Sequence, residues 1–404
     1  MAIRIALCSD IDLGFKFKHM TSKKGVVYEN HQLEAFEVLI SKIIENKVDV
    51  VLIAGNLFGT PKPKNKLIEK VVRGFKDLSS RGISVLILPG SHDMPLPFSD
   101  DRPVHYIFED LENVFLLLSE ENGVIKSKKI GEPVFEGTIK REKVTIFSPI
   151  SPFIRLDKLD LDLKVGTEST NIFVISDISA FKKDFKTIYT NFLEKLNNFG
   201  VKALLVGGVQ PTSLKKKNFK FQIVHCPQIH KNNFNYCNEK DGLLISTLQG
   251  GKFINTLKPD SISKFDVKHE ILDVNKIPFD KINDSIYEKI KQFSDSEKGI
   301  YKLSLTGKLD KTQYHNIEIF KFQEMGRRFN YYYELFDDIK FQESSPDIQG
   351  LKVIEELEQF TQDIIDRIVQ EENIKGSDKK NVELIYEDAM NLIKQNWDSV
   401  EGSR

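Results

Sequence analysis

Three short apolar stretches near the N-terminus each end in a cluster of polar residues. The clusters are Cys8-Ser9-Asp10-Ile11-Asp12, Ala54-Gly55-Asn56 and Gly90-Ser91-His92-Asp93. Carboxylate and amide oxygens are ligands that Mg²⁺ and Mn²⁺ accept in proteins, and an imidazole can transfer protons. These clusters are therefore candidate metal-binding or catalytic loops.

The loops need elements that hold them at one edge of a sheet. Apolar runs at residues 3–8, 48–54 and 83–88 are too short for buried helices, so they are expected to be strands. Residues 31–45 and 65–78 carry apolar side chains at helical spacing. This alternation predicts α/β layers around a largely parallel sheet, where functional loops gather beyond the carboxyl ends of the strands.

The remainder of the chain changes character twice. From Phe219 onward strands and turns alternate, as on the antiparallel side of a two-sheet sandwich. After Ser344-Ser345-Pro346, apolar residues recur at three- and four-residue steps, which predicts two amphipathic helices. We expect a core at residues 1–258, a small α+β domain at 259–342 and a C-terminal helical segment at 343–404.

Composition places few limits on function until the chain is divided. The whole chain has a net charge of −1, but residues 341–404 hold 7 basic and 15 acidic side chains, so this tail carries −8 and residues 1–340 carry +7. A basic body with an acidic tail is compatible with nucleic acid at the body. Three cysteines without metal-ligand spacing predict reduced thiols. No apolar stretch is long enough to cross a membrane, so a cytoplasmic or nucleoid-associated protein is expected.

The order and spacing of the three loops resemble those of the calcineurin-like metallophosphoesterases, and more narrowly those of the SbcD-type DNA repair nucleases. Asp241-Gly242-Leu243-Leu244 and the segment from Tyr301 to Gly307 are similar to later parts of the same family, so the resemblance covers roughly residues 1–342. It implies an α/β fold: a four-layer α-β-β-α sandwich with a small α+β capping domain that faces DNA and a C-terminal helical pair.

The resemblance also implies two divalent ions, seven ligands and a histidine that aids departure of the leaving group. Asp10 matches a ligand and His92 matches the catalytic histidine, as a vestigial or weak one. Three other ligand positions have changed: an expected histidine is Asp12, the bridging aspartate is Asn56, and an asparagine is Ser91. A neutral amide cannot offset two dications as a carboxylate does.

The two later motifs of the family have lost their histidines. Ser176 stands where the fourth motif has one, with Asp177 beside it, and Gly208 and Gln210 replace both histidines of the fifth. We therefore expect no bound cofactor. The alternative is one weakly held Mn²⁺ or Mg²⁺ in an oxygen-rich site. Its ligands would be Asp10, Asp12, Asn56 and Asp177.

Two surfaces are candidates for macromolecular partners. Lysines follow the second and fifth motifs, where related nucleases lay DNA, although a solvated loop face explains them equally well. The candidates are Lys62, Lys64, Lys66, Lys215, Lys216 and Lys217. In the family, helices after the capping domain hold an SMC-type, SbcC-like ATPase; packing within the chain is the alternative. The apolar stripe comprises Leu357, Phe360, Ile364, Leu384, Leu392 and Trp397.

The leading prediction is an SbcD-like DNA repair subunit that is catalytically inactive or strongly impaired and that binds DNA and an SMC-type ATPase. Members of the superfamily that lost their metals and persist as scaffolds make this plausible by analogy. The second hypothesis is an active Mn²⁺-dependent exo- or endonuclease with a rebuilt metal site. A small-molecule phosphoesterase is the third, and the similarity to the capping domain counts against it. The family resemblance also suggests a homodimer.

Overall fold

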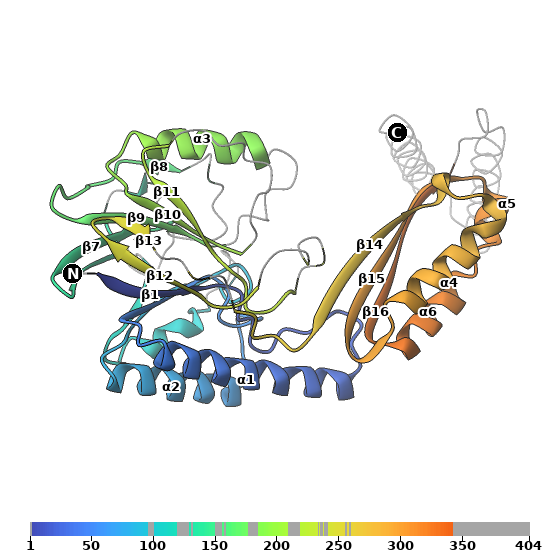
Figure 1. The fold of residues 1–404 in the computed structure, drawn as a ribbon, viewed down its shortest axis with the longest axis horizontal. Coiled ribbons are helices and arrows are strands. Elements are labelled where there is room, and N and C mark those ends of the chain that lie inside the picture. Colours follow the sequence, from blue (N-terminus) through green and yellow to red (C-terminus); the bar gives the residue numbers. More distant parts are fainter. Residues whose placement is uncertain are drawn as a thin grey trace, which may run out of the picture. The chain divides into compact units, whose positions relative to one another are not determined.

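Two β-sheets face each other in the N-terminal part of the chain, and helices cover their outer faces (Figure 1). The structure is a computed structural model. It describes residues 2–95, 101–118, 129–130, 132–149, 156, 159–176, 185–208, 219–232, 234, 237, 241–254, 257 and 260–341. Residues 1–306 and 317–338 group into one unit, and the described residues 307–316 and 339–341 belong to a second. The domain boundaries expected at 258/259 and 342/343 stay predictions.

The first sheet brings the three polar loops together. Its strand order is β13-β12-β1-β2-β3-β4. The bounds are β1 Ile3–Cys8, β2 Val50–Ala54, β3 Ser84–Leu88, β4 Val114–Leu116, β12 Leu244–Gln249 and β13 Lys252–Ile254. Strands β1 to β4 run parallel, with Cys8 opposite Ile53 and Ile53 opposite Ile87. Because the carboxyl ends of β1, β2 and β3 are in register, the loops that follow them meet at one edge.

The second sheet has the order β11-β10-β9-β7-β6. Its bounds are β6 Phe135–Ile139, β7 Glu142–Phe147, β9 Thr170–Ile175, β10 Ala203–Gly207 and β11 Gln222–Cys226. The short strands β5 Lys129–Ile130 and β8 Asp160–Leu161 pair separately. Strand β11 lies parallel to β10, so the prediction of an antiparallel arrangement after Phe219 was wrong for β11. It was right for β12 and β13, which extend the first sheet antiparallel to β1.

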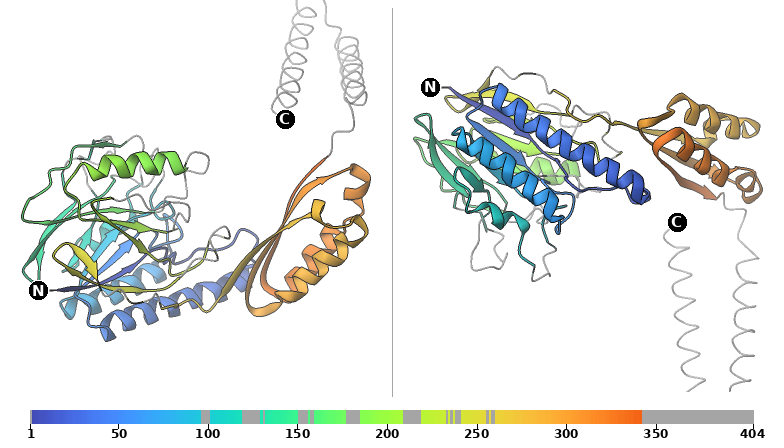
Figure 2. Two further views of the ribbon diagram at one scale, coloured as in Figure 1. Left: turned by 45° about the horizontal axis from the view of Figure 1, so that its top comes forward. Right: turned by 90° about the horizontal axis from the view of Figure 1, so that it is seen from below.

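Helices complete the four layers. Helices α1 (Ser22–Glu45) and α2 (Asn65–Ser80) lie side by side on the first sheet, and α3 (Phe185–Asn197) covers the second (Figures 1 and 2). A short 3-10 helix, η1, spans Val104–Phe108. Buried side chains recur at helical spacing on α2, including Val71 and Phe75. The predicted α-β-β-α sandwich is thus confirmed. Helix α1, however, begins at Ser22 and not at the predicted residue 31, and the Thr21 side chain caps its first turn.

Side chains close the two long edges of the sandwich. At one edge the Gln222 amide spans the sheets: its Nε2 donates to the carbonyl oxygen of Phe253 at 3.3 Å, and its Oε1 accepts from the Phe253 N–H at 2.7 Å. At the other edge the rings of Phe115 and Phe135 meet edge to face, with centroids 5.1 Å apart. Apolar side chains fill the space between the sheets, including Leu7 and Leu52. The motif loops therefore rest on a closed and fully packed support.

A second α+β region follows the sandwich. Its sheet has the order β14-β15-β16, with bounds Asp266–Asp273, Asp295–Leu309 and Asn330–Phe341. Helices α4 (Ile282–Gln292) and α6 (Ile319–Phe329) cover one face of it (Figure 1). The short helices are η4 Val274–Lys276, η5 Phe279–Lys281 and α5 Lys311–His315. We call residues 260–341 the capping region. Within the described residues, no helix is both long and apolar enough to cross a membrane.

Candidate functional site: the strand-end loops

The first two loops interlock through their backbones. Asp10, Asp12 and Asn56 have φ angles of 46°, 49° and 49°, in the left-handed region that side-chain-bearing residues rarely adopt. The N–H of Asp10 donates to the carbonyl of Gly55 at 3.1 Å, and the N–H of Asp12 donates to that of Asn56 at 2.9 Å. Backbone strain of this kind is typical of functional sites and survives only where surrounding contacts enforce it.

The Asn56 amide bridges the first and third loops. Its Nδ2 donates to Asp10 Oδ1 at 2.7 Å, and its Oδ1 accepts from the N–H of His92 at 3.0 Å. Gly90 leaves room for this contact, because a Cβ at that position would lie 2.0 Å from Asn56 Oδ1. Asn56 thus presents a hydrogen-bond donor to the Asp10 carboxylate, at the position where the family's bridging carboxylate would present oxygen.

Asp12 is fully buried and has protein partners on both carboxylate oxygens. Oδ1 lies 2.8 Å from His92 Nδ1, and Oδ2 accepts from Asn232 Nδ2 at 2.8 Å. Burial raises the pKa of the Asp12 carboxyl, whereas the hydrogen bonds from His92 and Asn232 act in the opposite direction. The His92 side chain itself is 41% exposed at the surface of the loop. Sequence reasoning missed Asn232, which no spacing pattern connects to a residue 220 positions away.

The third loop is held by the buried carboxylate of Asp93 and its contact with His105. Asp93 Oδ1 accepts from the N–H of Gly90 at 2.7 Å, and Oδ2 accepts from the N–H of Phe58 at 3.1 Å. His105 Nε2 lies 3.1 Å from the same Oδ2, and neither side chain is exposed. Asp93 thus holds the loop through hydrogen bonds to backbone N–H groups. The structure also gives His105 a partner, for which the sequence carried no signal.

In the described parts of the fourth and fifth motifs, Gly208 contributes its backbone N–H. Ser176 is buried directly after β9, whereas Gly208, directly after β10, has a φ of 76° and donates its N–H to Ser9 Oγ at 2.8 Å. Ser9 Oγ in turn donates to the carbonyl of Cys226 at 2.9 Å. Asp177 and Gln210 lie outside the described residues. Ser91 lies in the third loop, partly exposed.

The donor set does not fit a two-ion centre. The sequence resemblance predicts ligand histidines at the positions of Asp12, Ser176 and Gly208 and a bridging carboxylate at Asn56, whose amide instead donates to Asp10. Across the part of the chain that the structure describes, no group of three or more histidine, cysteine, aspartate or glutamate side chains is placed to hold a metal ion. A two-metal reaction therefore has no ligand framework in these described loops.

The lysines that follow β2 are paired with acidic or polar side chains. Lys62 Nζ lies 2.9 Å from Asp101 Oδ2, Lys64 Nζ lies 2.7 Å from Glu29 Oε2, and Lys66 Nζ donates to Asn30 Oδ1 at 3.2 Å. Glu29 is largely buried, so Lys64 is the most firmly held, while Lys62 is the most exposed. Lys215, Lys216 and Lys217 lie outside the described residues, as do Leu357, Phe360, Ile364, Leu384, Leu392 and Trp397.

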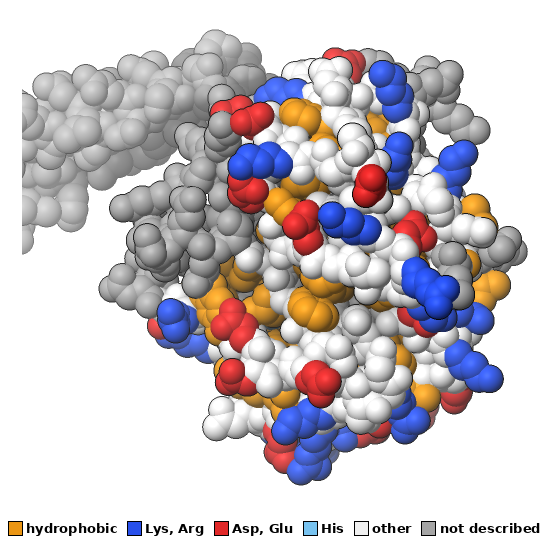
Figure 3. Space-filling view, turned by 90° about the vertical axis from the view of Figure 1, so that its left-hand side faces the viewer, with side chains coloured by type: hydrophobic (Ala, Val, Ile, Leu, Met, Phe, Trp, Pro, Cys, Tyr) orange, Lys and Arg blue, Asp and Glu red, His pale blue; other side chains and the backbone are white. Residues whose placement is uncertain are grey.

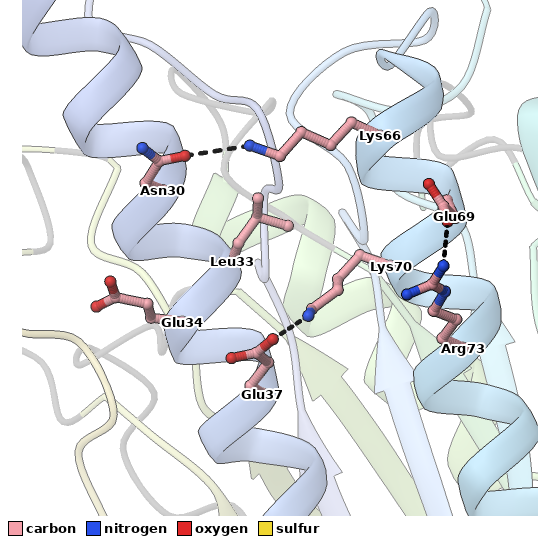
Figure 4. A pocket seen from close by; sticks show the side chains of 8 residues that line it. All are labelled: Asn30, Leu33, Glu34, Glu37, Lys66, Glu69, Lys70 and Arg73. Carbon is pink, nitrogen blue, oxygen red and sulfur yellow. Dashed lines mark hydrogen bonds and ion pairs between the residues drawn. The ribbon is translucent and has the colours of Figure 1, made fainter.

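A groove between α1 and α2 carries charges of both signs. Glu37 pairs with Lys70 across it, and Glu69 pairs with Arg73 along α2 at 2.5 Å (Figure 4). The full lining comprises Asn30, Leu33, Glu34, Glu37, Lys66, Glu69, Lys70 and Arg73. Positive and negative side chains are also interspersed on the face in Figure 3. Neither surface shows the single sign of charge that an electrostatic nucleic-acid site requires.

Comparison with known proteins finds similarity to one family of phosphoesterases. Residues 3–132 match the calcineurin-like phosphoesterase model. The chain is 24% identical to the DNA double-strand break repair protein Mre11 of Methanococcus maripaludis over 302 residues, 73% of this chain and 72% of that protein. This chain therefore contains a calcineurin-like phosphoesterase domain and is a homologue, at modest identity, of the SbcD-type nucleases. The protein of the same name from Methanocaldococcus jannaschii is 31% identical over 96 residues, and the chain spans only 25% of its length. That from Saccharolobus solfataricus is 26% identical over 151 residues, 37% of this chain and 38% of the relative.

Removal of the Asp93 carboxylate tests the role of its buried contact with His105 in the core. We expect Asp93→Ala to lower the free energy of unfolding by about 3–5 kcal/mol, because His105 and two backbone N–H groups lose a buried partner. Chemical denaturation measures the change. The control is Asp77→Ala, which removes an exposed pair with Arg81 and is expected to cost under about 0.5 kcal/mol. Equal effects of the two substitutions would contradict this account.

Acid should lower the stability of the fold through His230, whose backbone N–H donates to the backbone carbonyl of Asp10. Burial lowers the pKa of His230 from 6.5 to about 4, and in the described structure neither ring nitrogen has a hydrogen-bond partner. When the pKa of a histidine is lower in the folded state than in the unfolded state, protons bind the unfolded state more tightly. The stability of the fold is then complete above pH 6.5 and is lost as the pH falls toward the pKa of the folded state. Between pH 7 and pH 5 the parent should therefore lose about 2 kcal/mol more than His230→Leu.

Denaturation curves at the two pH values measure this difference. His31→Leu, which removes a partly exposed histidine on α1, provides the matched control and should leave the pH dependence of the parent unchanged. An equal pH dependence in the parent and in His230→Leu would show that His230 does not stay neutral in the fold.

Proposed function

We propose that this SbcD-type chain is a DNA repair subunit that binds DNA and an SMC-type, SbcC-like ATPase without cleaving DNA itself. The observation that carries the proposal is the hydrogen bond from Asn56 Nδ2 to Asp10 Oδ1. Nuclease chemistry on this scaffold needs an anionic bridge between two dications. Asn56 instead supplies a neutral amide, and its N–H points at the Asp10 carboxylate, so the position that needs negative charge carries a hydrogen-bond donor.

The partners of Asp12 support the same proposal. Both of its oxygens already interact with protein side chains, His92 and Asn232. A dication at Asp12 would have to displace at least one of these contacts and bring enough further ligands to offset its own dehydration. Those further ligands would have to replace the imidazoles that Ser176 and Gly208 do not supply.

One observation favours a second candidate, an active Mn²⁺-dependent nuclease with a rebuilt site. His92 is exposed at the loop, and Asp12 lies at its Nδ1, which is how a carboxylate orients a histidine for proton transfer. Such a pair needs an activated water nucleophile to cleave a phosphodiester. Asp177 and Gln210 would then belong to the site, with Mn²⁺ or Mg²⁺ as the metal. The third hypothesis, a small-molecule phosphoesterase, has no specific observation in its favour.

DNA contact and partner binding extend the proposal beyond the strand-end loops. The relatives are named as DNA double-strand break repair proteins. We place DNA at the lysines that follow β2 and at Lys215, Lys216 and Lys217, and the ATPase on residues 343–404. The complex would act in the cytoplasm on the nucleoid, and association of two copies would follow the pattern of the family.

A nuclease assay on the full-length protein tests the absence of catalysis. With single- and double-stranded DNA and either Mn²⁺ or Mg²⁺, we expect no more cleavage than in the presence of a chelator, because the ligand framework is missing. The His92→Ala variant should behave in the same way. Metal-dependent cleavage that disappears in His92→Ala would overturn the proposal in favour of the active nuclease. Analysis of bound Mn and Fe in the purified protein gives an independent result.

Deletion of the tail tests the partner. A chain ending at residue 346 should lose association with a co-expressed SMC-type ATPase, since the predicted apolar stripe lies wholly beyond that point. Co-purification measures the loss. A second variant keeps the tail but replaces Leu357 and Phe360 with alanine. It should weaken binding of the ATPase without changing the thermal unfolding of the core, which separates loss of the contact from damage to the fold. Retained binding by the truncated chain would refute this part of the proposal.

The salt dependence of DNA binding tests the lysines. Lys62→Ala should weaken duplex binding for all sequences and reduce the slope of log Kd against log salt concentration by about 0.9, the share of one phosphate contact. Lys47→Ala is the control, because Lys47 is exposed directly before β2, at the opposite edge of the sheet. An affinity that does not change with salt, or equal effects of the two substitutions, would contradict a DNA surface after β2.

A further inference from the structure

An aromatic cluster joins the segment after the first loop to the capping region. Phe17 stacks on Tyr332 of β16, with centroids 4.8 Å apart and an interplanar angle of 30°. Tyr28 of α1 meets Phe265 at 4.9 Å, and Phe265 meets Tyr331 at the same distance. We call this set the junction cluster. Its members are Phe17, Tyr28, Phe265, Tyr331 and Tyr332.

A reciprocal polar contact supports the junction cluster. Lys24 Nζ donates to the carbonyls of Tyr331 at 2.6 Å and Asn330 at 3.2 Å, and the Tyr331 hydroxyl donates to the Lys24 carbonyl at 2.5 Å. The start of α1 and the start of β16 thus each supply donors and acceptors to the other. Partial burial lowers the pKa of Lys24, in keeping with its position inside this contact.

A continuous chain of hydrogen bonds runs from the junction cluster to the first loop. The Tyr28 hydroxyl donates to Asn232 Oδ1 at 2.9 Å, and Asn232 Nδ2 donates to Asp12 Oδ2 at 2.8 Å. Asp12 Oδ1 continues the chain to His92 Nδ1 at 2.8 Å. The ring of Phe15, two residues before Phe17, also stacks near that of His92, with centroids 6.1 Å apart.

The geometry points to Asp12 as a positioning residue that ties the strand-end loops to the capping region through Asn232 and Tyr28. Its two δ oxygens accept from Asn232 and contact His92 at the same time, whereas a histidine has one nitrogen and one carbon at its δ positions. Aspartate at a position where the family has a ligand histidine therefore has a structural use of its own. This inference goes beyond the proposed function and holds whether or not the protein binds DNA.

The energetics favour a role in positioning. The Asn232 amide uses its oxygen toward Tyr28 and its nitrogen toward Asp12, so its orientation is fixed from both sides. Hydrogen bonds to a buried carboxylate are stronger than neutral ones, and loss of one partner leaves the other unsatisfied. Breaking either bond should therefore loosen the attachment of the junction cluster to the loops.

Distance measurements between spin labels test the inference in the full-length chain. Labels at Lys76→Cys on α2 and Lys291→Cys on α4 report on the core and the capping region, because both lysines are exposed while Cys8, Cys226 and Cys237 are buried. We expect a narrow distance distribution in the parent. Asn232→Ala and Asp12→His should each widen it at least about twofold, because the tie is then broken.

Two further variants keep the test decisive. Asn30→Ala removes an amide of the same kind on the exposed side of α1, where it accepts from Lys66, and should leave the distribution unchanged. Tyr28→Phe removes only the hydroxyl, so it gives an answer even if Asn232→Ala or Asp12→His fails to fold. If folded Tyr28→Phe and any folded variant at Asn232 or Asp12 match Asn30→Ala, the inference is wrong. Widening that follows Tyr28→Phe and not Asn30→Ala supports it.

Discussion

The burial of two carboxylates at neighbouring strand ends is the constraint on which the rest of the site depends. Asp10 and Asp12 follow β1 and are almost fully removed from water, a state that is costly unless each charge has partners. Metallophosphoesterases meet this cost with cations. Here amides from Asn56 and Asn232 and the imidazole of His92 contact the two carboxylates. The loops keep left-handed backbone at Asp10, Asp12 and Asn56 while their side chains stabilise one another.

Retention of the scaffold follows from where the folding energy lies. The registers of β1, β2 and β3 are set by apolar side chains between the sheets and under α1 and α2, none of which is a metal ligand. Loss of ligands therefore leaves the sheet intact. It changes only the contacts at the carboxyl edge, where Asp93 and His105 hold the third loop from within. Scaffold and chemistry can diverge because separate residues specify them.

Local patterns in the sequence predicted β1, β2 and β3, the helices α1 and α2, and the three N-terminal loops, because apolar periodicity and strand-end polarity are local signals. The early start of α1 was missed, since its first turns carry a weak apolar pattern and depend on the Thr21 cap. The sheet to which β11 belongs was also missed, because pairing partners are set by tertiary packing. Asn232 could not be predicted at all: it meets Asp12 only because β11 brings residues 226–232 beside the first loop.

The amide of Gln222 has a consequence for association with other chains. Exposed strand edges carry unpaired N–H and carbonyl groups and are templates for addition of a foreign strand. Strand β13 forms one end of the first sheet, yet the N–H and the carbonyl of Phe253 at its centre are both occupied by Gln222 from the second sheet. One side chain thus occupies the hydrogen-bonding groups at the centre of that edge strand, which protects the sandwich from aggregation through strand addition.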